Sequence, residues 1–151
     1  MGSDISETVK KWVQLTLYKS LNSIFKFSKE NDISMPQIGA LIRIYRKGSC
    51  NVSVIGIELG ISSAAASQLL HRMVQLGLID RSEDPNDRRI KNLNLTQKGL
   101  EFLNECFRTS YKWFEDLIFT YNNDEKREII TILDKLINKI NINDDIPDLE
   151  N

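Results

Sequence analysis

Hydrophobic residues recur at helical spacing along the first third of the chain. From Asp4 to Lys29 they are three or four positions apart, and no proline or glycine interrupts them. This pattern predicts one long helix. A second helix is expected from Met35 to Lys47, because Ser34 and Gln37 have the N-cap and N3 spacing of a capping box. Gly48 is expected to end that helix.

Two shorter helices are predicted in the centre of the chain. The first covers roughly Ser53 to Leu59 and is closed by Gly60. The next has Ser62 or Ser63 as its N-cap and continues to about Leu76, with an apolar face and an opposite polar face. A helix, a glycine turn and a second helix therefore follow each other directly.

A β-hairpin is predicted immediately after these helices. Leu78 to Ser82 and Ile90 to Leu95 are short runs of alternating apolar residues, and the turn between them is polar and charged. The order helix, turn, helix and hairpin is that of a winged helix-turn-helix, whose usual partner is duplex DNA.

The remaining chain is predicted to be helical up to an acidic tail. Large apolar residues at helical spacing extend from Gly99 to about Tyr121, and Asn123 or Asp124 is expected to cap a last helix that includes the apolar positions of 129–140. These helices carry more apolar surface than the end of one small domain needs. Part of that surface is therefore expected to face another subunit.

Composition changes this picture little. A chain of 151 residues with 41% hydrophobic residues can bury one ordinary core, and its net charge of -1 gives no sign of nucleic-acid binding. Basic residues nevertheless cluster in the helix-hairpin segment, at Arg72, Arg81, Arg88, Arg89 and Lys91. No apolar run is long enough to span a bilayer and the start lacks a secretory signal, so a cytoplasmic protein without a membrane partner is expected.

The segment from Val52 to Gly99 resembles the multiple-antibiotic-resistance regulator (MarR) family of winged-helix repressors. The resemblance rests on IGIELGISSAAASQLLHRMVQLGLIDR, then the hairpin tip DPNDRR, then LNLTQKG, in that order. The helices before and after this segment also follow the family's order. Gly56 and Ile57 depart from it, since the family more often has alanine and a polar residue there.

The resemblance implies a mainly α fold with a small β-hairpin wing and long N- and C-terminal dimerisation helices. The whole chain, 1–151, would then be one MarR-like chain. Residues 4–34 and 100–141 would form the helical dimerisation region, 35–99 the winged helix-turn-helix lobe, and 142–151 the acidic tail. The implied function is that of a homodimeric, sequence-specific regulator of transcription, more often a repressor, on a pseudo-palindromic operator.

The implied DNA-binding residues on the recognition helix are Ser62, Ser63, Ala64, Ser67, Gln68, His71 and Arg72. Gln68 is the best candidate for reading a base, because its amide can pair with adenine through two hydrogen bonds. Arg72 is expected to contact phosphate. The alternative for Gln68 and His71 is an ordinary solvated helix face.

At the hairpin tip the resemblance implies that Asp87 orients Arg89, and that Arg89 enters the minor groove. Arg88 would then contact the phosphate backbone. The alternative is that both arginines only keep an exposed hairpin soluble.

No cofactor is expected, and the sequence offers little for an enzyme: it has no glycine-rich phosphate loop, no cluster of metal ligands, and one histidine. Cys50 and Cys106 lie too far apart to suggest a disulfide framework or a zinc motif, so each is expected to be a small buried hydrophobe. A redox-responsive Cys50, activated by the neighbouring Arg46 and Lys47, stays open as an alternative. A second alternative is a winged-helix protein-interaction module without a DNA target.

Many members of the family bind small aromatic acids between the dimerisation helices and the DNA-binding lobe, so a small aromatic effector is an implied partner. Aromatic and cationic groups stand in suitable segments, although the same side chains also suit a core or an interface. They are Trp12, Tyr18, Arg43, Tyr45 and Trp113.

Overall fold

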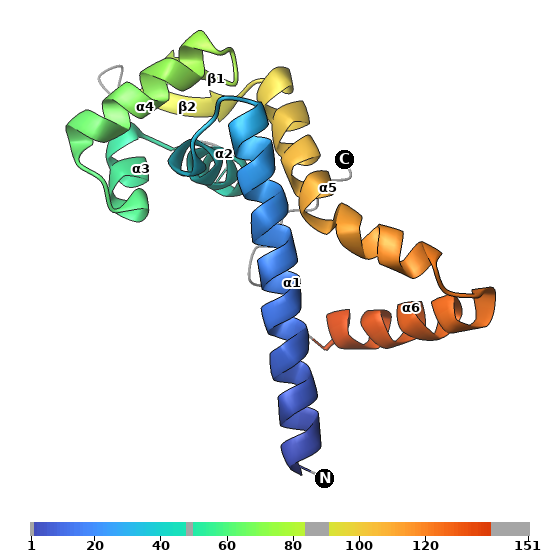
Figure 1. Cartoon of the computed structure of the whole chain (residues 1–151). Helices are drawn as coiled ribbons and strands as arrows, with labels where there is room; N and C mark the ends of the chain where they lie inside the picture. Colours follow the sequence, from blue (N-terminus) through green and yellow to red (C-terminus); the bar gives the residue numbers. More distant parts are fainter. Residues whose placement is uncertain (1, 48–49, 84–90, 140–151) are drawn as a thin grey trace. The chain divides into compact units, whose positions relative to one another are not determined.

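The computed structural model describes residues 2–47, 50–83 and 91–139 of the chain (Figure 1). Within them the elements follow the order α1 (Gly2–Glu30), α2 (Met35–Lys47), α3 (Val52–Leu59), α4 (Ser63–Gln75), β1 (Ile79–Glu83), β2 (Lys91–Leu95), α5 (Gln97–Phe119) and α6 (Asn123–Ile137). The prediction of a mainly α fold with a small β-hairpin is confirmed.

The chain divides into two compact units. One consists of residues 25–106, and the other of residues 1–24 together with 107–151. The first unit holds the helix-turn-helix and the hairpin, and we call it the winged unit. The second is built from α6 and the outer parts of α1 and α5, and we call it the terminal unit.

The helices of the winged unit begin where side chains satisfy the free backbone N–H groups of the first turn. At α2 the predicted capping box is confirmed: the Ser34 N–H donates to Gln37 Oε1 at 2.8 Å, and the Gln37 N–H donates to Ser34 Oγ at 3.4 Å. Asn51 caps α3 by accepting from the Val54 N–H at 3.0 Å. The third helix therefore begins one residue earlier than predicted.

The turn between α3 and α4 has the predicted glycine. Gly60 has a φ of 63°, in the left-handed region that L side chains rarely adopt, so it ends α3. Ser62 then caps α4, because its Oγ accepts from the Ala65 N–H at 3.2 Å.

The core of the winged unit forms where α2, α3, α4 and the hairpin meet. Its largest fully buried side chains are Leu41, Ile44, Ile55, Leu70, Met73, Ile79 and Leu93, together with Leu103 of α5. Burial of each contributes about 1.5–3 kcal/mol relative to exposure. This core fixes how α4 is oriented within the unit.

The hairpin is joined to this core at its base. The strands β1 and β2 pair antiparallel, with Ile79 opposite Leu95 and Arg81 opposite Leu93, and the Leu93 N–H also donates to the Cys50 carbonyl at 2.9 Å. Leu78, predicted to begin the first strand, instead lies in the turn before β1. Its N–H donates to the Met73 carbonyl at the end of α4, which closes the turn.

The end of α4 is tied to the first turn of α5. The Thr96 hydroxyl donates to the Gly77 carbonyl at 2.6 Å and accepts from the Gly99 N–H at 3.0 Å. The Lys98 Nζ donates to the Leu76 carbonyl at 2.7 Å. A Cβ on Gly99 would lie only 1.9 Å from the Leu78 carbonyl oxygen, so glycine is required for this close approach.

In the terminal unit an aromatic cluster joins α1 to α5. The Trp12 ring lies 6.3 Å from that of Trp113 and 5.5 Å from that of Phe114, between centroids. The Trp113 indole N–H donates to Ser20 Oγ at 3.3 Å. These contacts hold the two helices together within the unit.

The last helix begins with a capping box at Asn122, which corrects the predicted cap at Asn123 or Asp124. Asn122 Oδ1 accepts from the Glu125 N–H at 3.0 Å, and the Asn122 N–H donates to Glu125 Oε2 at 3.0 Å. A capping box needs glutamate or glutamine three residues after the cap, and only Asn122 meets that condition among the three candidates.

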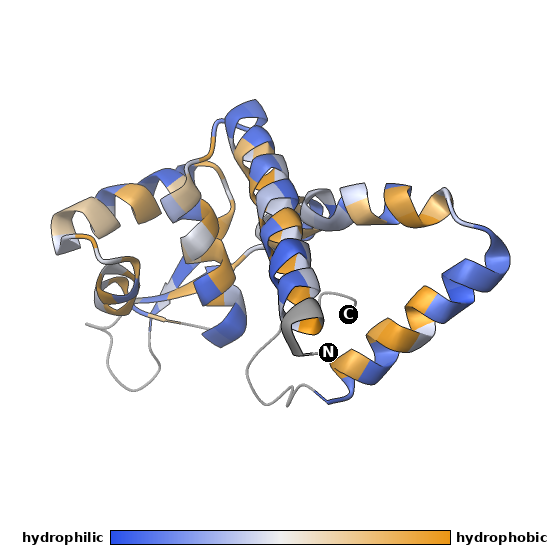
Figure 2. Cartoon of the chain, turned by 60° about the horizontal axis from the view of Figure 1, so that its bottom comes forward, coloured by the Kyte–Doolittle hydropathy of each residue, from blue (hydrophilic) through white to orange (hydrophobic). Residues whose placement is uncertain are grey.

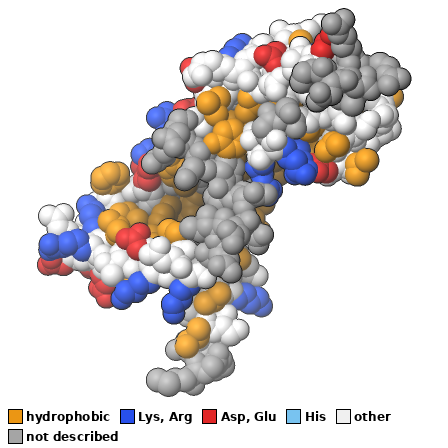
Figure 3. All heavy atoms as spheres, turned by 180° about the vertical axis from the view of Figure 1, so that it is seen from behind, with side chains coloured by type: hydrophobic (Ala, Val, Ile, Leu, Met, Phe, Trp, Pro, Cys, Tyr) orange, Lys and Arg blue, Asp and Glu red, His pale blue; other side chains and the backbone are white. Residues whose placement is uncertain are grey.

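The α6 helix exposes its apolar face in the single chain. No residue of α6 is buried, and Ile130, Leu136 and Ile137 are each exposed by more than half. Orange and blue residues alternate along α6 in Figure 2, and Figure 3 shows hydrophobic side chains gathered over α5 and α6 with charged ones around them. On α1, Val9, Val13 and Leu17 are also exposed by more than half.

Within the described residues, no single helix is long and apolar enough to cross a membrane. The α3 and α4 helices meet that criterion only when taken together, with a bend of 112° between them.

Candidate nucleic-acid interface

The α4 helix has one buried side and one exposed side. Ala66, Leu70 and Met73 are fully buried against the core of the winged unit. The residues predicted to meet DNA from this helix are all exposed: Ser62, Ser63, Ala64, Ser67, Gln68, His71 and Arg72. The structure therefore brings them together on the solvent side of α4, as the amphipathic pattern predicted.

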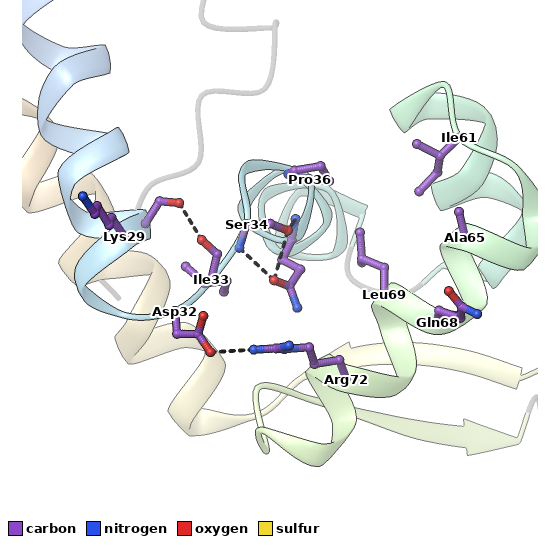
Figure 4. A pocket seen from close by; sticks show the side chains of 12 residues that line it. Lys29, Asp32, Ile33, Ser34, Pro36, Ile61, Ala65, Gln68, Leu69 and Arg72 are labelled. Atoms are coloured by element: carbon purple, nitrogen blue, oxygen red, sulfur yellow. Dashed lines mark hydrogen bonds and ion pairs between the residues drawn. The ribbon is translucent and has the colours of Figure 1, made fainter.

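Two of these residues already have partners within the fold. The Ser62 hydroxyl oxygen is the N-cap of α4, so this side chain helps to start the helix whatever else it does. Arg72 Nη2 lies 2.6 Å from Asp32 Oδ2, in an ion pair between α4 and the turn that follows α1 (Figure 4). Asp32 is 40 residues from Arg72 in the chain, and no sequence pattern marks the two as partners.

A pocket of about 660 Å³ lies beside this ion pair, within the winged unit (Figure 4). Ile33 and Pro36, from the turn after α1 and the start of α2, line it together with Leu69, Gln68 and Arg72 of α4. The pocket thus combines apolar side chains with the same polar residues that we consider for DNA contact.

The groups considered for an aromatic effector take part in contacts of the fold. Arg43 of α2 forms an ion pair with Glu58 of α3, in which the Arg43 side chain is 17% exposed and the Glu58 side chain 33% exposed. Trp12 and Trp113 belong to the aromatic cluster of the terminal unit. Tyr45 also has an interaction partner, whereas Tyr18 is 65% exposed.

The tip of the wing, with Asp87, Arg88 and Arg89, lies outside the described residues. The solvent face of the strands below it carries a small polar cluster. Asn94 Nδ2 donates to Asp80 Oδ1 at 3.2 Å and to Ser82 Oγ at 3.0 Å. These bonds connect β1 and β2 on the side away from the core.

The two cysteines are buried, as predicted. Burial raises the pKa of the Cys50 thiol, although the nearby Arg43 and Lys47 lower it in part. Burial also raises the pKa of Cys106, to about 11. A raised pKa keeps each thiol protonated at neutral pH, which argues against the reactive thiolate considered for Cys50.

The part of the chain that the structure describes has no group of three or more histidine, cysteine, aspartate or glutamate residues that could hold a metal ion.

Comparison with known proteins supports the family resemblance. The sequence model of the MarR family matches residues 33–91. The transcriptional repressor MprA of Escherichia coli is 29% identical over 124 residues, which are 81% of this chain and 70% of that protein. A solved transcriptional regulator of Thermotoga maritima superposes with a TM-score of 0.75 at 20% identity, covering 90% of this chain and 93% of that one.

A further neighbour is a MarR variant from E. coli, solved in complex with operator DNA. It has a TM-score of 0.56 at 20% identity, and the match covers 85% of this chain and 93% of that one. The matched segment, the relatives and the shared fold all indicate one class: residues 33–91 are similar to the MarR family of transcriptional regulators, and the chain has the fold of solved MarR proteins.

Proposed function

We propose that this protein is a sequence-specific regulator of transcription that binds double-stranded DNA as a homodimer, and that it acts as a repressor. The observation that carries the proposal is the exposed polar side of α4 in a winged helix-turn-helix unit, since this helix is the one that enters the major groove in such proteins. The repressor MprA among its relatives and the operator complex among its structural neighbours support it.

Within this proposal, the exposed residues of α4 have two kinds of role. Gln68 reads a base through its amide, and Arg72 contacts phosphate. Ser63, Ala64, Ser67 and His71 lie near the bases without a strong bidentate reader among them. Specificity then depends partly on the shape of the DNA.

We infer that the wing adds a minor-groove contact, in which Asp87 orients Arg89 and Arg88 meets the backbone. Narrow A·T-rich minor grooves concentrate negative potential and attract arginine. Replacing Arg89 with alanine should weaken operator binding without changing the free energy of unfolding. An unchanged affinity would contradict the minor-groove role.

We propose that the exposed apolar faces of the terminal unit form the dimer interface. A soluble monomer rarely exposes so much contiguous apolar surface, and α6 has no buried residue. A symmetric dimer would present two α4 helices to successive major grooves, about 34 Å apart. We also propose that a small aromatic effector releases the DNA by changing the spacing of the two winged units.

The direct test is selection of bound sequences from a random pool of duplex DNA. We expect a pseudo-palindrome whose half-sites are centred about 10 base pairs apart. Binding should also weaken steeply with salt, because the protein displaces counterions from several phosphates. A pool that yields no preferred sequence, with a shallow salt dependence, would reject the proposal and favour a protein-interaction module instead.

A further inference from the structure

The turn that ends α1 has an aspartate where helix ends usually have glycine. The Ile33 N–H donates to the Ser28 carbonyl at 3.0 Å, a bond typical of a Schellman ending, and Asp32 occupies the left-handed position with a φ of 49°. Among the described residues it is the single one other than glycine with a positive φ. Glycine would fit this position without strain, so stability of the turn does not explain the aspartate.

The side chain of this aspartate is directed to α4. Asp32 Oδ2 lies 2.6 Å from Arg72 Nη2, and the aspartate side chain is 93% exposed. Figure 4 shows the two side chains pointing toward each other at the edge of the pocket. An ion pair this exposed contributes little to the stability of the fold, because water and salt screen it.

We propose that Asp32 is a specificity-determining residue for DNA binding, because its carboxylate competes with a DNA phosphate for the guanidinium of Arg72. This inference rests on the proposed function. In the free protein the Asp32 carboxylate neutralises Arg72. When a phosphate takes its place, Asp32 is left unpaired beside a negatively charged backbone, so the contact at Arg72 gains less than an unpaired arginine would.

The competition has a distinct effect on salt dependence. An arginine that binds phosphate releases a counterion from DNA, and each such contact adds about 0.9 to the slope of log K against log salt. In the wild-type protein the liberated Asp32 attracts a cation again, which cancels this gain. The contact between Arg72 and phosphate therefore adds little to the free energy of binding to random duplexes. Contacts that depend on sequence then supply a larger share of the binding free energy.

The test compares Asp32→Asn and Asp32→Gly with the wild-type protein in DNA titrations at several salt concentrations. Both asparagine and glycine tolerate the left-handed backbone, so both variants are expected to fold, and glycine removes the strain as well. The probes are a 30-base-pair duplex of random sequence and the duplex obtained by selection. We expect affinity for the random duplex to rise about two- to fivefold per subunit, the range that corresponds to an exposed ion pair. The salt slope should steepen by about 0.9 per subunit.

Glu30→Gln is the matched control. Glu30 lies two residues before Asp32 and pairs with Lys26 instead of Arg72, at 3.7 Å. It reports the effect of removing one negative charge from the same turn. In an Arg72→Ala background, the gain from Asp32→Asn should fall to that of Glu30→Gln.

The outcomes separate this inference from the proposed function. If the wild-type protein shows no salt-dependent binding to either duplex, the proposed function fails and this inference fails with it. If the wild-type protein binds DNA but either Asp32 variant has equal or lower affinity for the random duplex, only this inference is overturned. The same holds if the gain from Asp32→Asn persists without Arg72.

Discussion

Gln68 and Arg72 lie one turn apart on the exposed side of α4, yet their side chains suit different parts of DNA. An amide can pair with the edge of one particular base, whereas a guanidinium binds phosphate in any sequence. Replacing Gln68 with alanine should therefore cost about 1–3 kcal/mol in binding to the selected operator. Binding to random duplex and the salt slope should stay the same. Titrations against operators with single base-pair changes check this, because specificity should relax at one position in each half-site.

Gln75 offers a matched control for that prediction. It is the same residue type, exposed at the C-terminal end of α4. Its replacement with alanine should leave operator affinity within twofold of the wild-type value, on the order of measurement error in mutant binding comparisons. Equal losses on operator and random DNA after Gln68→Ala would show that Gln68 reads no base.

Gly56 is a single residue whose replacement should stabilise the fold. It lies inside α3, where glycine costs up to about 1 kcal/mol relative to alanine. An added Cβ would lie 3.4 Å from both the Ala66 Cβ and the Ile61 carbonyl oxygen, which are ordinary contact distances. Gly56→Ala should therefore raise the free energy of unfolding by up to about 1 kcal/mol. Urea unfolding followed by circular dichroism measures it.

The contrasting variant is Gly60→Ala. Gly60 has open space around its Cβ position but a φ of 63°, so the cost of alanine there is backbone strain alone. We expect a loss of about 1–2 kcal/mol. If Gly56→Ala also destabilises the protein, α3 and α4 pack more tightly than these distances indicate.

At the scale of elements, local signals predicted most helix boundaries. The spacing of Ser34 and Gln37 predicted the start of α2, and Gly60 predicted the end of α3. The predicted cap of α6 is one or two residues late, because Asn122, Asn123 and Asp124 are all good caps and only the position of Glu125 decides between them. The sequence therefore contains the signal that distinguishes Asn122 from the other two.

No comparable signal in the sequence predicts the contact between Asp32 and Arg72. It joins two elements that are 40 residues apart, and both side chains are exposed and charged, so neither hydrophobic pattern nor local spacing marks them as partners. The polar face of α4 is different, because helical periodicity alone places Ala64, Ser67, Gln68 and His71 opposite the apolar face. The sequence thus predicts which face of the helix is available, but not which neighbouring charge modifies it.

Gly99 lies where the first turn of α5 meets the end of α4, so a substitution there affects both helices. A Cβ on Gly99 would lie 1.9 Å from the Leu78 carbonyl oxygen, which is backbone and cannot rotate away. Gly99→Ala must therefore separate the end of α4 from the first turn of α5. We expect a loss of about 1–3 kcal/mol or more in the free energy of unfolding. Denaturant unfolding checks the loss.

Gly56→Ala is the control for this variant, since it makes the same chemical change in a helix of the same unit without a clash. A stability for Gly99→Ala equal to that of the wild-type protein would mean that the two helices can separate at no cost.

At the scale of the whole molecule, the exposed apolar surface of the terminal unit is the proposed dimer interface. The exposed Ile130 lies on the apolar face of α6, and its neighbour Thr131 lies on the polar side, where its hydroxyl donates to the Arg127 carbonyl. Ile130→Glu would bring an unpaired charge into a dimer interface, which costs several kcal/mol. We therefore expect the wild-type protein to sediment as a dimer and Ile130→Glu to sediment mainly as a monomer.

Thr131→Glu adds the same charge to the same helix on its other side, so it should remain dimeric and bind DNA normally. Ile130→Glu should lose at least about tenfold in affinity for the full operator, because two linked half-site contacts become independent. Its affinity for a duplex with one half-site should stay close to that of the wild-type protein, since the winged unit has its own core in residues 25–106. A dimeric Ile130→Glu with full operator affinity would show that a surface other than the apolar face of α6 joins the two subunits.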